Sequence, residues 1–253
     1  FLYIDNPGDR LLNAARFMIV LCGIGLGVLV FFWTYQWLGL VPAVWALAFY
    51  TMSPTVLANT SVVTTDAGIT CFIFGTVYFL WRTTQHYSAL NVAGLIAFFM
   101  MAIVTKFSAV ILGPLIVVLL AAAVRADTCI TLRRVTVLVP ALALAAVLAI
   151  WAVYGFPYAP TRSADWILTL ESAPLAQTVP RLAHLTEWID RHHLLPNSFT
   201  EGFLIFAQST TTTNDNFLAG NYSSSGWWYY FPVAFLIKTP LGFLLLIAVG
   251  VVA

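Results

Sequence analysis

The sequence LNAARFMIVLCGIGLGVLVFFWTYQ occupies residues 12–36, and Arg16 is its only charged residue. A helix that crosses the hydrocarbon core of a bilayer needs about 20 consecutive residues that are mostly apolar. This segment satisfies that requirement, because it consists largely of Leu, Ile, Val, Phe and Gly. We therefore predict a membrane-spanning helix here, and similar apolar segments recur along the chain.

The composition of the whole chain is that of a membrane protein. Of its 253 residues, 61% are hydrophobic and 8% are charged, and the mean hydropathy is +0.91. Soluble proteins carry about 25% charged residues, so a soluble globular fold is excluded, and a disordered chain would be poor in apolar residues. A formal net charge of +1 offers no basic patch, so no nucleic-acid partner is expected. The composition predicts an all-α polytopic membrane protein.

Seven segments are predicted as transmembrane helices. They are residues 12–36, 40–57, 66–83, 89–105, 107–124, 135–155 and 229–253. A single helix through the fourth and fifth would be about 54 Å long, too long for a hydrocarbon core of about 30 Å. We therefore expect a tight hairpin with Lys106 at its tip. Thr239-Pro240 predicts a local break in the last helix.

Charge sets the expected orientation. The loop at 125–134 carries Arg125, Arg133 and Arg134 against Asp127, and the positive-inside rule makes that side cytoplasmic. The 156–228 segment then lies outside. It is rich in proline and polar residues, with amphipathic stretches at 163–171 and 177–192.

The chain thus divides into three parts: a transmembrane bundle at 1–155, an extracytoplasmic loop region at 156–228 and a truncated transmembrane helix at 229–253. Because it starts at Phe1 and stops inside an apolar run, we expect an internal piece of a longer protein.

Ionisable residues near membrane spans are costly and mark candidate functional sites. Four lie on the expected extracytoplasmic side: Asp66, Arg16, Lys106 and Lys238. Three of them also have a structural explanation. Asp66 suits a helix N-terminus, with Thr64 and Thr65 as capping candidates, Arg16 can snorkel to the interface, and Lys106 can be a surface residue. Lys238 is the hardest to explain, since it lies about nine residues inside the last span.

Four aromatic residues precede Lys238: Trp227, Trp228, Tyr229 and Tyr230. They form a membrane-interface belt, or they contact a sugar ring and a prenyl chain.

Other catalytic classes find no support in the sequence. It has no dinucleotide or nucleotide phosphate-binding loop, no HExxH and no GxSxG. The residues His184, His192 and His193 lack metal-ligand spacing. Cys22, Cys71 and Cys129 are expected to be small core residues. No cofactor is expected, no metal ligands are assigned, and metal dependence is left open.

Three blocks of sequence resemble the phospholipid-carrier-dependent glycosyltransferases, the family of protein O-mannosyltransferases and aminoarabinose transferases. The first is DRLLNAARFMIVLCGIGLGVLVFFW, residues 9–33. The second is MSPTVLANTSVVTTDAGITCFIFGTVYFLWR, residues 52–82, followed by Thr105-Lys106. The third joins LPNSFTEGF to FLAGNYSSSGWWYYFPVAFLIKTP, residues 195–203 and 217–240, and is similar to a bacterial branch.

The resemblance implies a helical bundle of the C-type glycosyltransferase fold, in the plasma or inner membrane with an extracytoplasmic active face. It implies a polyprenyl-phosphate-linked sugar donor, with a mannose-like or aminoarabinose-like sugar. The acceptor would be a protein, lipid or glycan hydroxyl, among membrane lipids. The family's principal catalytic Asp lies in the first extracytoplasmic loop, and neither Asp5 nor Asp9 matches it, so we expect this chain to lack it.

By the same resemblance, Arg16 would hold the carrier phosphate and Asp66 would be a second acid. Lys106 and Lys238 would add positive charge around the donor. The attacking hydroxyl needs a carboxylate and the leaving phosphate needs cations, which this set supplies.

The alternative is a transporter or flippase for a lipid-linked or polar solute, because polar residues and broken helices also mark transporters. Against it, the charges gather on one face instead of the midplane. A channel is less consistent with the sequence, which has no pore-lining ring or filter-like motif. The large loop and the clustered charges argue against a non-enzymatic scaffold.

Overall fold

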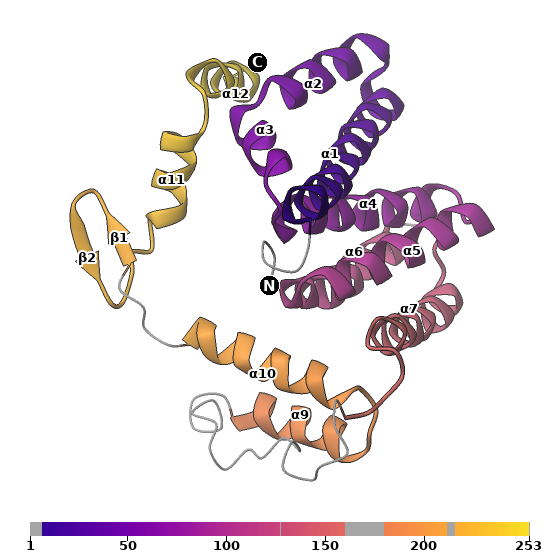
Figure 1. Cartoon of the computed structure of the whole chain (residues 1–253). Helices are drawn as coiled ribbons and strands as arrows, with labels where there is room; N and C mark the ends of the chain where they lie inside the picture. The colour runs from indigo at the N-terminus through magenta and orange to yellow at the C-terminus, as the bar shows by residue number, and fades with distance from the viewer. Residues whose placement is uncertain (1–6, 127, 160–179, 212–215, 253) are drawn as a thin grey trace.

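The computed structural model describes residues 7–126, 128–159, 180–211 and 216–252, and this part of the chain is almost entirely helical (Figure 1). The first helices are α1 (Gly8–Leu38), α2 (Leu40–Met52), α3 (Pro54–Ser61), α4 (Thr65–Gln85) and α5 (Ala89–Thr105). A 3₁₀ turn, η1 (Phe107–Ile111), leads into α6 (Leu112–Arg125) and α7 (Leu132–Val153). Then follow α9 (Pro180–Arg191), α10 (Asn197–Thr211), the strands β1 (Asn216–Leu218) and β2 (Asn221–Ser223), α11 (Tyr230–Lys238) and α12 (Leu241–Val252).

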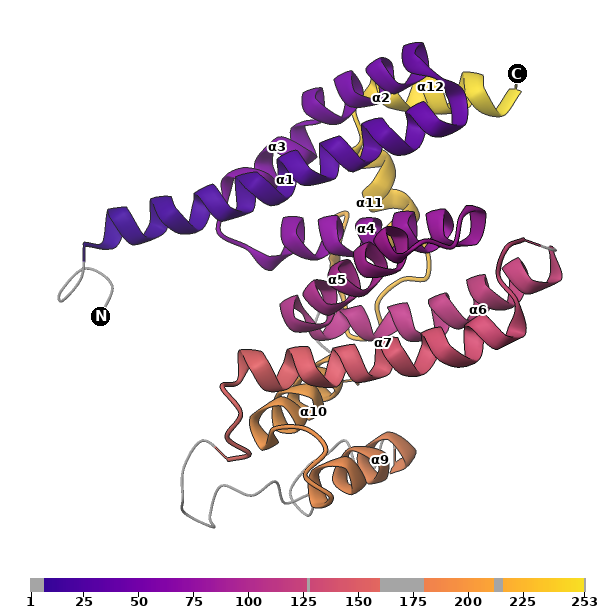
Figure 2. The ribbon, with the colours of Figure 1, turned by 90° about the vertical axis from the view of Figure 1, so that its right-hand side faces the viewer.

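Two buried clusters hold the bundle together. One cluster is made of side chains from the four helices α4, α5, α6 and α7. Its fully buried side chains include Leu80, Leu95, Leu112, Leu120 and Leu138. The other lies between α1 and α4, where Trp33 packs edge-on against Phe74 at 5.0 Å. Much of the outer surface is apolar, which suits contact with lipid tails. Helix α4 therefore occupies the centre, between α1 and α5 (Figure 2).

Helices α4 and α5 pack through two reciprocal glycine–phenylalanine contacts. A Cβ added at Gly75 would lie 2.1 Å from Cδ1 of Phe98, and one added at Gly94 would lie 2.4 Å from Cδ1 of Phe79. The two phenyl rings stack with their centroids 5.4 Å apart. Small residues let helix backbones approach closely in membranes, so these glycines fix how α4 and α5 fit together.

The predicted second span, 40–57, is wrong as a single helix. The chain bends by 58° between α2 and α3, because Pro54 opens α3 and holds Ser53 in an extended conformation. In the last segment, α11 and α12 are bent by 113° around Thr239 and Pro240, which confirms the predicted break.

All seven predicted spans fall on helical segments, but fewer satisfy a length and composition test for crossing a membrane. In the described residues three segments satisfy it: α1, η1 together with α6, and α7. The count rises to five if the bent pairs α2–α3 and α11–α12 are each counted as one span. Helix α5 is apolar but has 17 residues, and α4 has 21 but carries Asp66 and Arg82. The protein is an all-α, multi-pass membrane protein; the count of seven stays a prediction, as does the three-part division at 155 and 228.

Helices α9 and α10 pack on each other and lie against the end of α7, where Trp151 Nε1 donates to the carbonyl of Leu194 at 3.0 Å (Figure 2). Helix α9 confirms the amphipathic stretch predicted at 177–192. The stretch at 163–171 lies outside the described residues. Helix α10 and the β1–β2 hairpin were not predicted.

Candidate functional site

The structure brings two of the predicted residues into contact. Lys106 Nζ lies 2.8 Å from Asp66 Oδ1, although the residues are 40 positions apart in the chain. The side chains are 40% and 54% exposed, respectively. The pair is therefore an accessible ion pair at one end of the bundle.

The ends of two neighbouring helices position this pair. Asp66 is in the first turn of α4, where the helix dipole favours a carboxylate. Lys106 follows the last residue of α5, and its extended backbone (φ −158°, ψ 138°) ends that helix. The predicted hairpin tip is confirmed as a helix break at Lys106, after which α6 packs on α4 and α7. The contact follows from the antiparallel packing of α4 and α5.

The predicted capping role of Thr64 is wrong. Thr64 is the N-cap residue of α4, but its side chain accepts no hydrogen bond from the first turn. Its buried hydroxyl oxygen has no hydrogen-bond partner among the described residues. The first turn of α4 therefore relies on Asp66 for its favourable charge, and Thr70 Oγ1 donates to the carbonyl of Asp66 at 2.7 Å.

A cavity of about 250 Å³ opens beside Asp66. Its polar walls come from α2, α3 and α4, and the residues are Tyr50, Thr55, Asn59, Thr60, Asp66 and Thr70. Tyr50 donates its hydroxyl to the carbonyl of Gly23 at 2.6 Å, which joins α2 to α1. The side chains of Asn59, Thr60 and Thr70 donate to carbonyls of their own helices, so the Asp66 carboxylate is the main polar group that the cavity offers to a ligand. The sequence analysis did not identify these polar residues as part of a site. The spacing of Asp66 and Thr70, one helical turn apart on the same face of a helix, was the sequence signal that could have indicated them.

An apolar groove of about 520 Å³ continues from this cavity. The groove and the cavity share Gly23, Tyr50, Val56 and Thr60. Beyond them the groove follows α1, with Ile24, Val28, Phe31 and Phe32 in its wall. Ile24, Val28 and Phe32 are about half exposed. A long hydrocarbon chain can therefore enter from the side, with its polar end at Asp66.

A second pair of cavities lies on the Lys106 side, between the bundle and helices α9 and α10. Their volumes are about 340 and 230 Å³. Both are lined by Ile103, Lys106, Phe107, Ile150 and Phe199. Phe107, the residue after Lys106, contacts the rings of Phe199, Phe203 and Phe206 on α10. The Asp66–Lys106 pair thus stands between two sets of cavities.

Arg16 does not join this pair in the structure. It is exposed on α1, and its guanidinium donates to Asn13 Oδ1 at 3.4 Å. It lies seven residues, or about 10 Å, before Gly23, which packs against Thr60 in the Asp66 cavity. Arg16 is therefore about two helical turns from Gly23 of the groove, toward the N-terminus of α1.

Lys238 and the aromatic residues before it are also separate from Asp66 and Lys106. Lys238 is exposed at the end of α11 and forms no ion pair with the described acidic residues. Trp228 is 89% exposed, and it contacts Tyr229 edge-on at 5.5 Å. In Figure 1, α11 lies apart from α4 and α5. The binding roles of Lys238, Trp227, Trp228, Tyr229 and Tyr230 stay predictions.

A buried polar network that the sequence did not reveal holds α9 and α10 together. Asp190 Oδ1 accepts from Asn197 Nδ2 at 3.1 Å and from Thr200 Oγ1 at 2.7 Å, and all three residues are at most 4% exposed. Tyr158 donates to the carbonyl of Asp190 at 3.0 Å. Burial, followed by the hydrogen bond and charge of Asp190, raises the pKa of Tyr158 to about 12.

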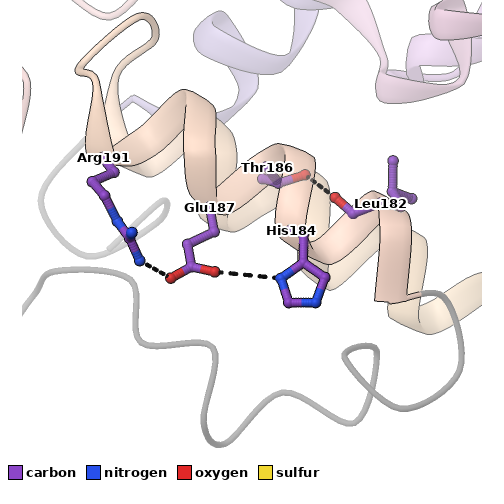
Figure 3. A network of polar contacts seen from close by, with 5 residues as sticks. All are labelled: Leu182, His184, Thr186, Glu187 and Arg191. Atoms are coloured by element: carbon purple, nitrogen blue, oxygen red, sulfur yellow. Dashed lines mark hydrogen bonds and ion pairs between the residues drawn. The ribbon is translucent and has the colours of Figure 1, made fainter.

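The outer face of α9 carries a second set of charges, drawn in Figure 3. Glu187 pairs with Arg191 and lies 3.8 Å from Nδ1 of His184. These residues lie three and four positions apart on one helix face, a spacing that stabilises helices slightly. In the described residues, no group of three or more His, Cys, Asp or Glu side chains could hold a metal ion.

Comparison with known families identifies the chain. Residues 8–152 match the model of the dolichyl-phosphate-mannose-protein mannosyltransferase family. Searches of curated proteins and of solved structures gave no match. The family match covers more than half of the chain and includes both Asp66 and Lys106, which confirms the resemblance seen in the sequence. The chain therefore belongs to the dolichyl-phosphate-mannose-protein mannosyltransferase family and is a membrane glycosyltransferase of that type.

Proposed function

We propose that this protein transfers a sugar from a polyprenyl-phosphate donor to an acceptor hydroxyl on the extracytoplasmic side of the membrane. The observation that carries the proposal is the continuity of the apolar groove with the polar cavity at Asp66. A polyprenyl-phosphate sugar has the same division, because a long apolar chain ends in a charged phosphate and a polar ring. The groove would take the chain and the cavity would take the sugar.

The charges around the cavity fit the chemistry of this transfer. The bond between the anomeric carbon and the phosphate oxygen breaks, and negative charge develops on the leaving prenyl phosphate. Lys106 is close enough to the cavity to stabilise that charge, through its contact with Asp66. Arg16, at the watery end of α1, would reach the phosphate once a donor is bound, since its guanidinium can bind two phosphate oxygens at once.

Asp66 would orient the sugar or the acceptor hydroxyl. As the acceptor oxygen forms its bond to the anomeric carbon, its proton must pass to a base. The family resemblance implies that a carboxylate of the first extracytoplasmic loop accepts this proton, with inversion at the anomeric carbon. Asp66 would be the second acid, and Lys106 would keep it charged and fixed in direction.

The proposed sidedness rests on the two ends of α4. Asp66 is in its first turn and Arg82 in its last, so they lie at opposite ends of the bundle. Arg125 is the last residue of α6, and Arg133 and Arg134 lie in the first turn of α7, on the Arg82 side of the bundle. Positive loops favour the cytoplasm, so the Asp66 end would face outward from the plasma or inner membrane.

The test uses the full-length protein in proteoliposomes with a radiolabelled polyprenyl-phosphate sugar. Release of sugar to water reports donor use without any acceptor. We expect Asp66→Asn and Arg16→Ala to lower turnover by roughly 10²- to 10⁴-fold, as removal of a general acid–base or charge-stabilising group does. Asp9 is also a carboxylate in the first turn of a helix, so Asp9→Asn is the matched control and should keep wild-type turnover.

A second comparison tests the groove. Ile24→Trp would fill the groove beside Val28, whereas Leu21→Trp places the same ring on another face of α1. We expect donor use to fall only in Ile24→Trp. Equal turnover in these two variants would remove the groove from the site. No turnover in wild-type protein with any tested donor, together with solute uptake, would favour the transporter.

A further inference from the structure

A cavity that the proposed function does not use lies between α1 and α4, toward the ends of these helices at Leu38 and Gln85. Its volume is about 350 Å³. None of its lining residues lines the groove beside α2 and α3, and they are Val30, Trp33, Thr34, Trp37, Leu38 and Phe74. Trp37 and Leu38 are 62% and 65% exposed. This cavity is therefore almost entirely apolar and opens on the outer surface of the bundle.

Three of the nine tryptophans of the chain lie at this cavity or next to it. Trp33 stacks on Trp81 with the ring centroids 5.8 Å apart, and Trp37 lies 5.7 Å from the same ring of Trp81. Tryptophan is enriched where the hydrocarbon core of a bilayer meets the headgroups. The cluster therefore indicates that lipid headgroups lie at this end of α1 and α4.

Arg82 carries a positive charge to the same cluster. It is half-buried in the last turn of α4, where a cation suits the helix dipole. Its guanidinium donates to the hydroxyl of Tyr78 at 3.4 Å, and it forms no ion pair with the acidic residues that the structure describes. Arginine has five N–H donors. Most of the donors of Arg82 therefore have no acceptor within the described part of the chain.

The hydroxyl of Tyr78 brings two further donors to this place. Gln36 Nε2 donates to it at 3.0 Å across the contact between α1 and α4. Tyr78 is 4% exposed, and none of the described residues accepts the hydrogen of its hydroxyl. Trp33, which lines the cavity, lies 5.7 Å from the ring of Tyr78. An amide, a phenol and a guanidinium thus meet beside the cavity, and such a set of donors suits an anion.

The surroundings of Arg82 are also positively charged. Arg125, Arg133 and Arg134 lie at the same end of the bundle. The backbone N–H of Cys129 donates to the carbonyl of Thr84 at 3.3 Å, so the loop between α6 and α7 packs against the end of α4. Clustered arginines at a membrane surface attract anionic lipids over about one Debye length. The charge at this end therefore favours an anionic headgroup over a neutral one.

We infer that a phospholipid with an anionic headgroup binds between the ends of α1 and α4. Its phosphate would lie at Arg82, Gln36 and Tyr78, and one acyl chain would occupy the adjoining cavity. This lipid is a bound ligand and not a substrate, so no bond forms or breaks. It would join α1, which forms a wall of the groove, to the central helix α4. The inference does not depend on the proposed function.

The first experiment is photolabelling of the full-length protein in phosphatidylcholine proteoliposomes. The probe is phosphatidylglycerol with a diazirine in one acyl chain, and the comparison probe is phosphatidylcholine with the same chain. We expect the phosphatidylglycerol probe to label Thr34, Trp37 and Leu38 at least several times more strongly than the comparison probe. Unlabelled phosphatidylglycerol should compete, whereas glycerol 3-phosphate, which has no acyl chain, should not. Equal labelling by the two probes, or labels spread evenly over the lipid-facing surface, would overturn the inference.

A pair of charge variants tests the headgroup site. Arg82→Gln removes the guanidinium beside the cavity, while Arg133→Gln removes an exposed arginine from the same end of the bundle. Loss of a hydrogen-bonding charged partner weakens binding by roughly tenfold or more. We expect that loss of labelling in Arg82→Gln only. Unchanged labelling in Arg82→Gln, or the same loss in both variants, would mean that no specific headgroup site exists there.

A pair of tryptophan substitutions tests the cavity. Thr34→Trp fills it, whereas Tyr35→Trp places the same ring at the next residue of α1, which is 49% exposed and outside the cavity. We expect labelling to fall in Thr34→Trp and to stay at the wild-type level in Tyr35→Trp. Leu38→Trp is a second filling variant in case Thr34→Trp does not fold.

A thermal measurement checks the same site without a probe. A ligand that binds the folded protein raises its Tm with ligand concentration. We expect added phosphatidylglycerol to raise the Tm of wild type, Arg133→Gln and Tyr35→Trp in detergent, and to leave that of Arg82→Gln and Thr34→Trp almost unchanged. An equal rise in all five proteins would place the lipid elsewhere and overturn the inference.

Discussion

At the scale of single residues, the Asp66–Lys106 contact adds little to stability. Both side chains are about half exposed, and ion pairs at such positions contribute about 0–1 kcal/mol. Helices α4 and α5 are held together by their buried apolar contacts instead. Apart from the favourable position of Asp66 at the N-terminus of α4, the two charges gain little from their pairing, and ionisable residues next to apolar segments are costly, which favours a role in binding or catalysis.

Exchanging the two residues separates stability from function. The double variant Asp66→Lys with Lys106→Asp keeps one charge of each sign at the same contact. We expect its thermal unfolding temperature to stay near that of wild type, while donor turnover falls at least as far as in Asp66→Asn. The reason is that the cavity would contain an ammonium group where the carboxylate should orient a hydroxyl. Recovery of turnover in the double variant would show that only the pairing matters.

The sequence predicted which charges to examine but not which of them meet. Asp66 and Lys106 stood out because ionisable residues are rare in this chain. Their contact depends on the register of α4 against α5, which is set by side-chain packing and leaves no periodic signal. Lys238 looked equivalent from its position in an apolar segment. The bend of 113° after α11 places it on a separate exposed helix end.

At the scale of elements, hydrophobic periodicity located the helices well and the polar region poorly. The boundaries of α5 agree with the prediction of 89–105, and α9 falls inside the predicted amphipathic stretch. Helix α10 was missed because its sequence ends in serine and threonine residues that resemble a loop. Its position depends on the buried hydrogen bonds from Asn197 and Thr200 to Asp190, which join the end of α9 to the start of α10 and leave no periodic signal in the sequence.

The Tyr158 hydroxyl makes the anchoring of this region sensitive to alkaline pH. Its pKa in the folded protein is about 12, above the ordinary value of 10.0. The folded state therefore favours the neutral phenol, and its stabilising effect is complete below pH 10 and is lost as the pH rises through about 12. Tyr158→Phe removes the hydrogen bond to Asp190 and should destabilise the protein by about 1 kcal/mol below pH 10.

The measurement is the difference in Tm between wild type and Tyr158→Phe in detergent, from pH 8 to 11.5. We expect a constant difference up to about pH 10 and a narrowing above it. Both proteins lose the same other charges at high pH, so each is the control for the other. A difference that does not change with pH would mean that the phenol is not selectively bound in its neutral form.

At the scale of the whole molecule, charge and shape divide the protein into two ends. The end with Asp66 carries the ion pair and the cavities on either side of it, the end with Arg82 carries the arginine-rich loop, and α9 and α10 lie alongside α7 (Figure 2). The sequence predicted this division from loop charges alone. It did not predict that cavities open on both sides of the ion pair, because a cavity depends on several helices at once.

The orientation of the two ends can be measured with single cysteines. The background variant replaces Cys22, Cys71 and Cys129, which are free, with alanine. Ser61 is exposed near Asp66, and Gln85 is exposed at the other end of α4, so each can be replaced with a single cysteine. In sealed right-side-out vesicles, a membrane-impermeant maleimide should label Ser61→Cys before lysis and Gln85→Cys only after it. The opposite order would reverse the proposed topology.

The glycine–phenylalanine contacts of α4 and α5 fix the register that brings Asp66 and Lys106 together. Phe98 lies over Gly75 and Phe79 over Gly94, so neither helix can slide along the other without a collision. A slip by one helical turn would move Lys106 about 5.4 Å along α4, nearly twice its 2.8 Å separation from Asp66. Two positions that have no side chain, Gly75 and Gly94, thus control an ion pair more than two helical turns away.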